Sequence, residues 1–168
     1  LEDAVLDDEL IEHSAMSAFW NGGQNCSANM RQLIAEPLVD EFTGLILERV
    51  KAFKLGDPLD PATDIGSMIT KDHKEMVMNY IQSGVDEGAN MLVGGESDVP
   101  GYFIKPTVFE NITPEMKISR EEIFGPVLGI MPIKNAEEAL RIASDTDYGL
   151  HATVFTQNID QALHMARS

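Results

Sequence analysis

Segments with helical and with strand-like patterns alternate along this chain, and the alternation limits its fold more than any other feature of the sequence. Apolar residues recur at helical spacing over Asp3–Phe19 and again from Pro37 to Phe53, with a strand-like run, Arg31–Ala35, between them. Further helices are expected over Thr70–Gly88, Ala136–Ala143 and Asp160–Arg167, and further strands over Met91–Val93, Tyr102–Phe109, Val127–Ile133 and His151–Phe155. The pattern predicts an α/β fold, a mostly parallel twisted sheet with helices on both faces.

Glycines and polar residues mark where these elements should begin and end. The pair Gly22-Gly23 should break the first helix, and Gly94-Gly95 should close the strand that begins at Met91. Either Thr70 or Asp72 can cap the third long helix, because both side chains accept hydrogen bonds from backbone N–H groups. No internal repeat, low-complexity segment or linker divides the chain, so we expect a single domain.

Length and charge limit the classes of partner. The chain has 168 residues, which suits one domain over residues 1–168, and a formal net charge of −16. Nucleic acids and anionic membranes both require basic surface, so neither is expected as a partner. No run approaches the ~20 apolar residues of a membrane span. One cysteine cannot form an internal disulfide, so we expect a reducing, cytoplasmic setting.

The single cysteine, Cys26, is the first candidate for chemistry. It follows a helix and a diglycine, and its neighbours Asn25 and Ser27 are polar. If Cys26 lies at the start of a helical turn, free backbone N–H groups and the helix dipole would favour the thiolate, which suits a nucleophile. The alternative is a buried cysteine whose only role is packing, and the polar neighbours weigh against it.

The histidines do not indicate a metal site. The chain has four, at His13, His73, His151 and His164. They lie far apart in the sequence and lack the spacing of zinc ligands, so no metal is expected. His13 lies on the helix that precedes Cys26, but a general base must come within ~3 Å of the nucleophile, and sequence alone does not establish that contact.

Two motifs far apart in the chain carry a family resemblance. Phe19-x-Asn21-x-Gly23-Gln24-x-Cys26-x-Ala28 resembles the cysteine signature of the aldehyde dehydrogenase superfamily. Glu121-Glu122-Ile123-Phe124-Gly125-Pro126-Val127 resembles the second hallmark of that superfamily. Further segments match in the expected order: Gly56-Asp57-Pro58, Asp64-Ile65-Gly66, Gly101–Thr107 and Tyr148–Phe155. The resemblance covers essentially the whole chain.

The resemblance implies an oxidoreductase that converts a small-molecule aldehyde to a carboxylic acid with NAD or NADP. Cys26 would be the catalytic nucleophile, forming a thiohemiacetal that gives up hydride and leaves a thioester for water to hydrolyse. Its own backbone N–H would be one donor to the oxyanion. Glu122 would hold the nicotinamide ribose by accepting from two hydroxyls, and Phe124 would pack beside the nicotinamide.

The resemblance also implies that Trp20, Asn25 and Ser27 line the aldehyde channel. For Trp20 the alternative is an anchor in the core. His73 falls where some family members place a polar residue near the cofactor, and a lone surface histidine is the competing interpretation.

The chain also departs from the family pattern. Family members are about three times as long, and the nucleotide-binding domain, the general-base glutamate, a second oxyanion donor and the subunit contacts lie outside this sequence. We therefore expect a truncated catalytic domain that neither turns over nor binds NAD or NADP alone, from a homo-oligomeric enzyme. Two alternatives remain open: a CoA-acylating semialdehyde dehydrogenase, and a non-catalytic scaffold domain with a packing cysteine.

Overall fold

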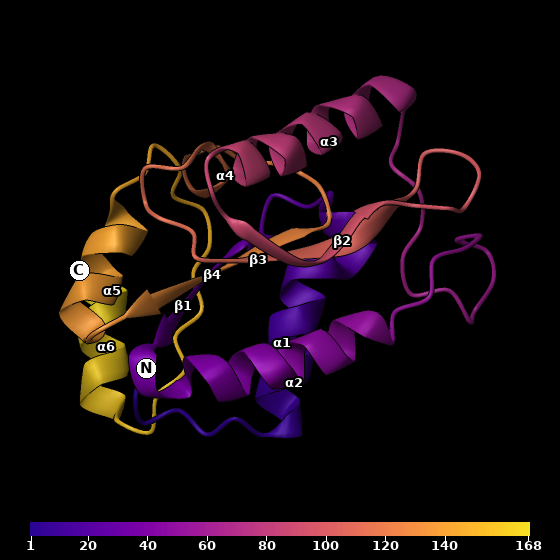
Figure 1. The fold of residues 1–168 in the computed structure, drawn as a ribbon. Coiled ribbons are helices and arrows are strands. Elements are labelled where there is room, and N and C mark those ends of the chain that lie inside the picture. The colour runs from indigo at the N-terminus through magenta and orange to yellow at the C-terminus, as the bar shows by residue number, and fades with distance from the viewer.

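Four strands form one sheet at the centre of the computed structural model, which describes residues 1–168 (Figure 1). The strands are β1 (Arg31–Ala35), β2 (Asn90–Glu96), β3 (Ile104–Glu110) and β4 (Val127–Ile133). Their order is β1-β4-β3-β2; β4 runs parallel to both β1 and β3, and β2 is an antiparallel edge strand. The mostly parallel sheet predicted from the sequence is therefore confirmed.

Helices cover both faces of this sheet. They are α1 (Asp8–Phe19), α2 (Val39–Lys51), α3 (Lys71–Asp86), α4 (Lys117–Arg120), α5 (Ala136–Ser144) and α6 (Ile159–Arg167), with short 3-10 helices η1 (Trp20–Gly23) and η2 (Glu36–Leu38). Figure 1 shows α3 above the sheet and α1 and α2 below it. None of the helices has both the length and the apolar character that crossing a membrane requires.

The two faces of β4 explain why its sequence is almost continuously apolar. Leu128 and Ile130 pack into the core between the sheet and helices α1 and α2. Val127 and Met131 pack into the core between the sheet and helices α3, α4 and α5. All four are at most 3% exposed. Successive side chains of a strand point to opposite faces, so a strand covered on both sides needs apolar residues at every position.

Side-chain caps determine where two of the helices begin. Asp7 accepts a hydrogen bond from the Leu10 N–H at 2.9 Å, so α1 begins after Asp7 rather than at Asp3 as expected. Thr70 caps α3 and accepts from the His73 N–H at 3.1 Å, which decides between the two residues proposed for this role.

The strand expected over Met91–Val93 does not end at its glycines, and this expectation was wrong. β2 continues through Gly94-Gly95 to Glu96, with a shift of register at the bulge. A Cβ on Gly94 would lie 2.4 Å from Thr107 Oγ1, and its φ is +115°. The glycine therefore allows β2 and β3 to approach closely instead of terminating the strand.

The strand expected over His151–Phe155 is also wrong, because no second strand lies beside that segment. It forms no regular structure. Its contacts are scattered: Asn29 donates to Thr153 Oγ1 at 3.3 Å, the amino terminus of Leu1 donates to the Phe155 carbonyl oxygen at 2.9 Å, and the Phe155 ring packs edge-on against His13. An alternating pattern becomes a strand only where a neighbouring backbone can complete the ladder.

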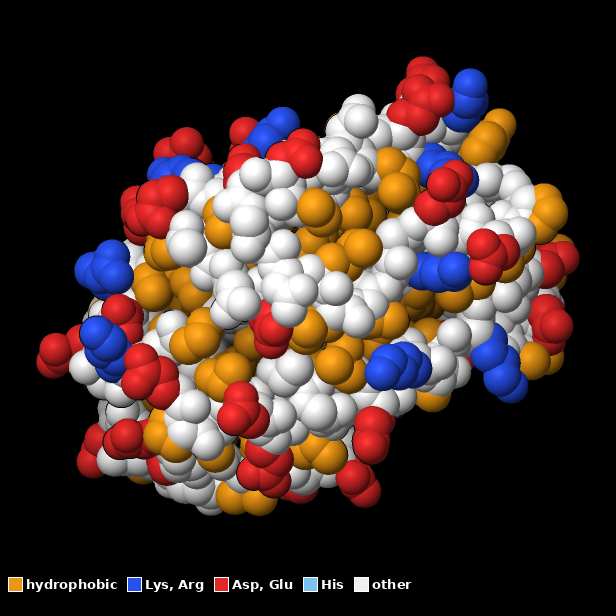
Figure 2. Space-filling model, viewed as in Figure 1, with side chains coloured by type: hydrophobic (Ala, Val, Ile, Leu, Met, Phe, Trp, Pro, Cys, Tyr) orange, Lys and Arg blue, Asp and Glu red, His pale blue; other side chains and the backbone are white.

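Acidic side chains dominate the charged surface. Figure 2 shows carboxylates around the whole rim of one face and fewer basic side chains among them, in keeping with the net charge of −16. Hydrophobic side chains gather in the middle of the same face, between α3 and α2 (Figure 2).

Candidate active site

The two motifs meet because of the strand order. The segment that carries Cys26 leads into β1, and the segment that carries Glu122 and Phe124 leads into β4. We call them the cysteine segment (residues 20–28) and the glutamate segment (residues 121–126). Since β1 and β4 are parallel neighbours, both segments lie at the same edge of the sheet. They touch directly, because a Cβ on Gly23 would lie 2.1 Å from the carbonyl oxygen of Gly125.

The cysteine segment turns sharply after α1. Three successive residues, Asn21, Gly22 and Gly23, adopt positive φ angles of 54°, 65° and 68°. Glycine takes this left-handed conformation without steric cost, and asparagine tolerates it better than most residues do. The expected break of the first helix at the diglycine is confirmed, and α1 ends at Phe19.

Cys26 lies in an exposed turn. The Ala28 N–H donates to the Asn25 carbonyl oxygen at 3.0 Å and closes a four-residue turn with Cys26 inside it. No helix begins at Cys26, so the helix start considered for this residue is not observed. Exposure in this chain also argues against a purely packing role. The Sγ atom has one weak partner, Asn25 Oδ1 at 3.9 Å.

The residues predicted to surround Cys26 differ in their hydrogen bonding and exposure. Asn25 donates from Nδ2 to Ser27 Oγ at 3.0 Å, and the Ser27 N–H donates back to Asn25 Oδ1 at 3.4 Å. These two side chains therefore bracket Cys26. Trp20 is 59% exposed, which excludes the interpretation of Trp20 as a core anchor.

Gln24 ties the cysteine segment to the loop before α3, a role that was not anticipated. Its Oε1 accepts from the Ile69 N–H at 2.9 Å, and its Nε2 donates to Ser67 O at 3.3 Å and to Asn21 O at 3.1 Å. The side-chain amide thus pairs with the loop backbone much as a strand residue would. Its position inside the cysteine motif was the only sequence signal for it.

The glutamate segment presents a free carboxylate and an exposed ring. Glu122 is exposed and takes part in none of the hydrogen bonds or ion pairs within the chain, so both of its oxygens can accept. Phe124 is 36% exposed and has a φ of +54°, an uncommon conformation for a bulky residue. The glutamate segment thus exposes an unpaired carboxylate and an aromatic ring two residues apart in the sequence.

Helix α3 also contacts the glutamate segment, through His73 and Tyr80. His73 Nε2 lies 2.8 Å from the Phe124 carbonyl oxygen, and the two rings are edge to face, 6.1 Å apart. The Tyr80 hydroxyl donates to Glu121 Oε2 at 2.7 Å, and this hydrogen bond raises the pKa of Tyr80 to about 12. Neither contact was predicted, because sequence does not show which segment packs against a helix.

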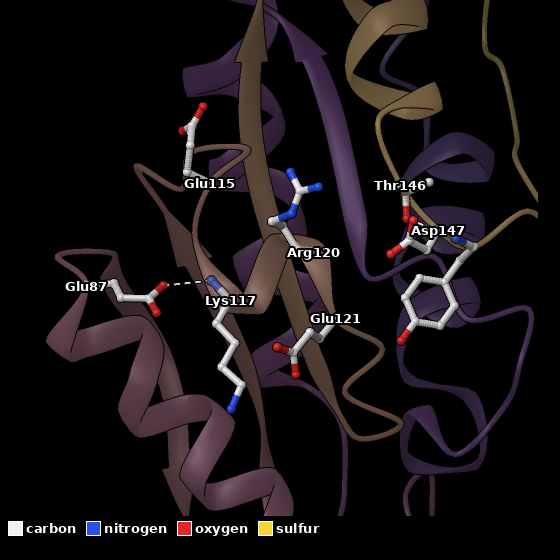
Figure 3. A pocket seen from close by; sticks show the side chains of 8 residues that line it. Glu87, Glu115, Lys117, Arg120, Glu121, Thr146 and Asp147 are labelled. Carbon is white, nitrogen blue, oxygen red and sulfur yellow. Dashed lines mark hydrogen bonds between the residues drawn. The ribbon is translucent and has the colours of Figure 1, made fainter.

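A pocket of about 470 Å³ lies beside Glu121, and its lining is mostly charged (Figure 3). In the view of Figure 3, Glu121 lies between Lys117 and Asp147, and Glu87 accepts from the Lys117 N–H at 2.7 Å. Cys26, Glu122 and Phe124 do not line this pocket. Its lining mixes acids with bases, so it gives no ligand a single complementary charge.

The fold does not pair a histidine with Cys26. The His13 ring packs against Phe155 with centroids 5.5 Å apart, and the thiol contacts only Asn25 through a hydrogen bond. The arrangement gives no support to a Cys–His hydrolase.

Comparison with known proteins agrees with the two motifs. The model of the aldehyde dehydrogenase family matches residues 1–168. Aldehyde dehydrogenase 1A1 of Gallus gallus is 45% identical over 165 residues, which are 98% of this chain and 32% of that protein. Aldehyde dehydrogenase, cytosolic 2, of Macroscelides proboscideus is 43% identical over 96% of this chain and 67% of its own length.

Solved structures show the same likeness. The HpcC protein of Thermus thermophilus superposes with a TM-score of 0.94 at 39% identity, over 98% of this chain and 33% of that one. Betaine aldehyde dehydrogenase of Staphylococcus aureus, solved in complex with NAD+, gives a TM-score of 0.94 at 34% identity, over 99% and 34%. The chain thus spans about a third of the length of most of these relatives. It belongs to the aldehyde dehydrogenase family.

Proposed function

We propose that this chain carries the nucleophile and the nicotinamide-ribose contact of an enzyme that oxidises aldehydes to carboxylic acids with NAD or NADP. One observation carries the proposal: the backbone contact of Gly23 with Gly125 joins the segment of exposed Cys26 to the segment of unpaired Glu122. The betaine aldehyde dehydrogenase named above, which was solved with NAD+, supports the choice of cofactor.

The reaction begins at Cys26. Its thiolate adds to the carbonyl carbon of the aldehyde, and the displaced electron pair moves to the oxygen, where the Cys26 backbone N–H can donate to it. A bound nicotinamide would supply the acceptor for the hydride that this carbon loses, and Cys26 would keep the acyl group as a thioester. Water then attacks the thioester carbon, releasing the carboxylic acid and the thiol.

The remaining site residues bind and orient. Glu122 would accept from two ribose hydroxyls, and Phe124 would pack beside the ring and restrict its position. Asn25, Ser27 and exposed Trp20 would form the near wall of the aldehyde channel.

The chain is proposed to act as a truncated catalytic domain. It spans about a third of the Gallus gallus relative, and the general base, the second oxyanion donor and most of the cofactor site are expected from other segments. Such groups contribute about 10²- to 10⁴-fold each, so the isolated chain should not oxidise aldehydes. We propose that the full-length enzyme is a cytoplasmic homo-oligomer.

Substitution of the nucleophile tests the proposal. In the full-length protein, Cys26→Ala should abolish aldehyde-dependent reduction of NAD+ or NADP+ while NADH binding stays within about twofold, because the thiol takes no part in holding the cofactor. Ordinary turnover by this variant would refute the assignment. Gly44→Ala, on the exposed side of α2 with open space around its Cα, is the matched control.

Two further measurements address the alternatives. Iodoacetamide should label Cys26 of the full-length protein at neutral pH faster than it labels free cysteine; a rate no higher than that of the free thiol would favour a scaffold. Product analysis with and without coenzyme A separates release of the acid from transfer of the acyl group.

A further inference from the structure

One stripe of α3 contacts the glutamate segment at three points. His73, Val77 and Tyr80 are spaced i, i+4 and i+7, so they lie on the same face of the helix. His73 Nε2 is hydrogen-bonded to the Phe124 carbonyl oxygen, and the Tyr80 hydroxyl to the Glu121 carboxylate. Between them, Val77 packs so closely that a Cβ on Gly125 would lie 2.6 Å from its methyl carbon. We call these three residues the α3 clamp.

We propose that the α3 clamp positions Glu122, with His73 and Tyr80 acting as positioning residues that fix the segment on either side of its carboxylate. The inference rests on the proposed function of Glu122 as the ribose contact. Glu122 has no hydrogen bond of its own within the chain, so its direction depends on how firmly its neighbours are held.

The two anchors act in different ways. The His73 hydrogen bond holds the carbonyl of Phe124, whose left-handed φ of +54° is unfavourable for a bulky residue and needs support from its surroundings. The Tyr80 hydroxyl binds Glu121, and Lys117 Nζ lies 4.8 Å from the centroid of the Tyr80 ring. Of two adjacent carboxylates, Glu121 is thereby tied to the protein and Glu122 is left free for a ligand.

Hydrogen bonds also connect the α3 clamp to the cysteine segment, which carries the nucleophile. Thr70 caps α3 by accepting from the His73 N–H, and the preceding residue, Ile69, donates from its N–H to Gln24 in the cysteine segment. A continuous set of contacts therefore runs from Gln24 through the start of α3 to Phe124. Loss of either polar contact of the clamp, at His73 or at Tyr80, should move Glu122 relative to Cys26 and leave the core, which includes Val77, intact.

The test uses His73→Phe and Tyr80→Phe in the full-length protein, since each change keeps a ring and removes one donor. The equilibrium Kd of NADH, followed by its fluorescence, should rise about 3- to 10-fold in each variant, because each loses one hydrogen bond that orders the segment. Melting temperatures should change by no more than a few degrees. His73→Gln retains a donor and should restore the Kd to within about twofold.

Two comparison variants separate the possible outcomes. Asn79→Ala, at an exposed position of α3 outside the clamp, should leave NADH binding unchanged. Glu122→Gln should weaken binding at least as much as the clamp variants do. If Glu122→Gln weakens binding while His73→Phe and Tyr80→Phe bind normally, the clamp is refuted and the proposed function stands. Normal binding by Glu122→Gln refutes the ribose contact and the clamp together.

Discussion

Gly23 and Gly125 meet backbone to backbone: a Cβ on Gly23 would lie 2.1 Å from the carbonyl oxygen of Gly125 and 2.4 Å from its carbonyl carbon. Real Cβ atoms do not approach this closely, and backbone atoms cannot move aside as a flexible side chain can. The contact joins the segment that carries the thiol to the segment that carries the free carboxylate. The relative position of the two proposed functional groups therefore depends on the absence of one methyl group.

Gly23→Ala should separate the two segments. The change combines a backbone clash with a φ of +68°, which L-residues rarely adopt, and it should cost several kcal/mol of unfolding free energy, about 3 or more. Urea denaturation of the protein measures this loss. Gly44→Ala provides the contrast, because it lies within α2 with open space around it and should raise stability by about 0.5–1 kcal/mol. Equal stability of the two variants would contradict the proposed contact.

Thr70→Ala should loosen the start of α3. It removes the oxygen that accepts from the His73 N–H at 3.1 Å, and loss of such a cap costs about 1 kcal/mol. Thermal unfolding should show the loss, and Thr70→Ser, which keeps the hydroxyl, should restore most of it. No recovery with serine would mean that the cap does not stabilise the helix.

The ion pair between Glu12 of α1 and Arg49 of α2 should make stability depend on acid pH. Arg49 Nη2 donates to Glu12 Oε1 at 2.9 Å, and hydrogen bonding to the guanidinium holds the pKa of Glu12 below its ordinary value of 4.5. The stabilisation is therefore present above pH 4.5 and is lost as the pH falls through the lowered pKa. Both side chains are partly exposed, so it amounts to about 1 kcal/mol or less.

Arg49→Met tests this pair because it keeps the aliphatic stem and removes the charge. Its stability deficit relative to the unchanged protein should be present at neutral pH and should shrink in acid, as measured by urea denaturation at a series of pH values. A deficit that stays constant with pH would assign the effect to packing against Phe53, over which the guanidinium also lies.

Tyr80 should titrate at a higher pH than an ordinary tyrosine. Its hydrogen bond to Glu121 raises its pKa to about 12 from an ordinary value of 10.0. Because folding favours the protonated phenol, the bond contributes fully below pH 10 and is lost as the pH rises towards 12. Ultraviolet absorbance of phenolate should show one late step that disappears in Tyr80→Phe and moves earlier in Glu121→Gln. A late step that survives in Tyr80→Phe would contradict the assignment.

Local patterns predicted most of the elements correctly. Arg31–Ala35 and Val127–Ile133 form strands with the expected bounds. The Val127–Ile133 pattern succeeds because β4 is buried on both faces, which demands apolar side chains along almost the whole strand. The pattern at His151–Phe155 was equally strand-like and failed, since a strand also needs a partner that its own sequence does not contain.

The sequence by itself determined which residue types are available for chemistry and the family to which they point: one thiol, Cys26, in one motif, and two adjacent carboxylates, Glu121 and Glu122, in the other. Only the tertiary structure decided how they are supported. Parallel pairing of β1 with β4 brings the two motifs to one sheet edge, and α3 supplies His73 and Tyr80 from a segment with neither motif. These contacts depend on the order of the strands and on how α3 packs across the sheet. Both result from burial of the whole core, so no local sequence pattern predicts them.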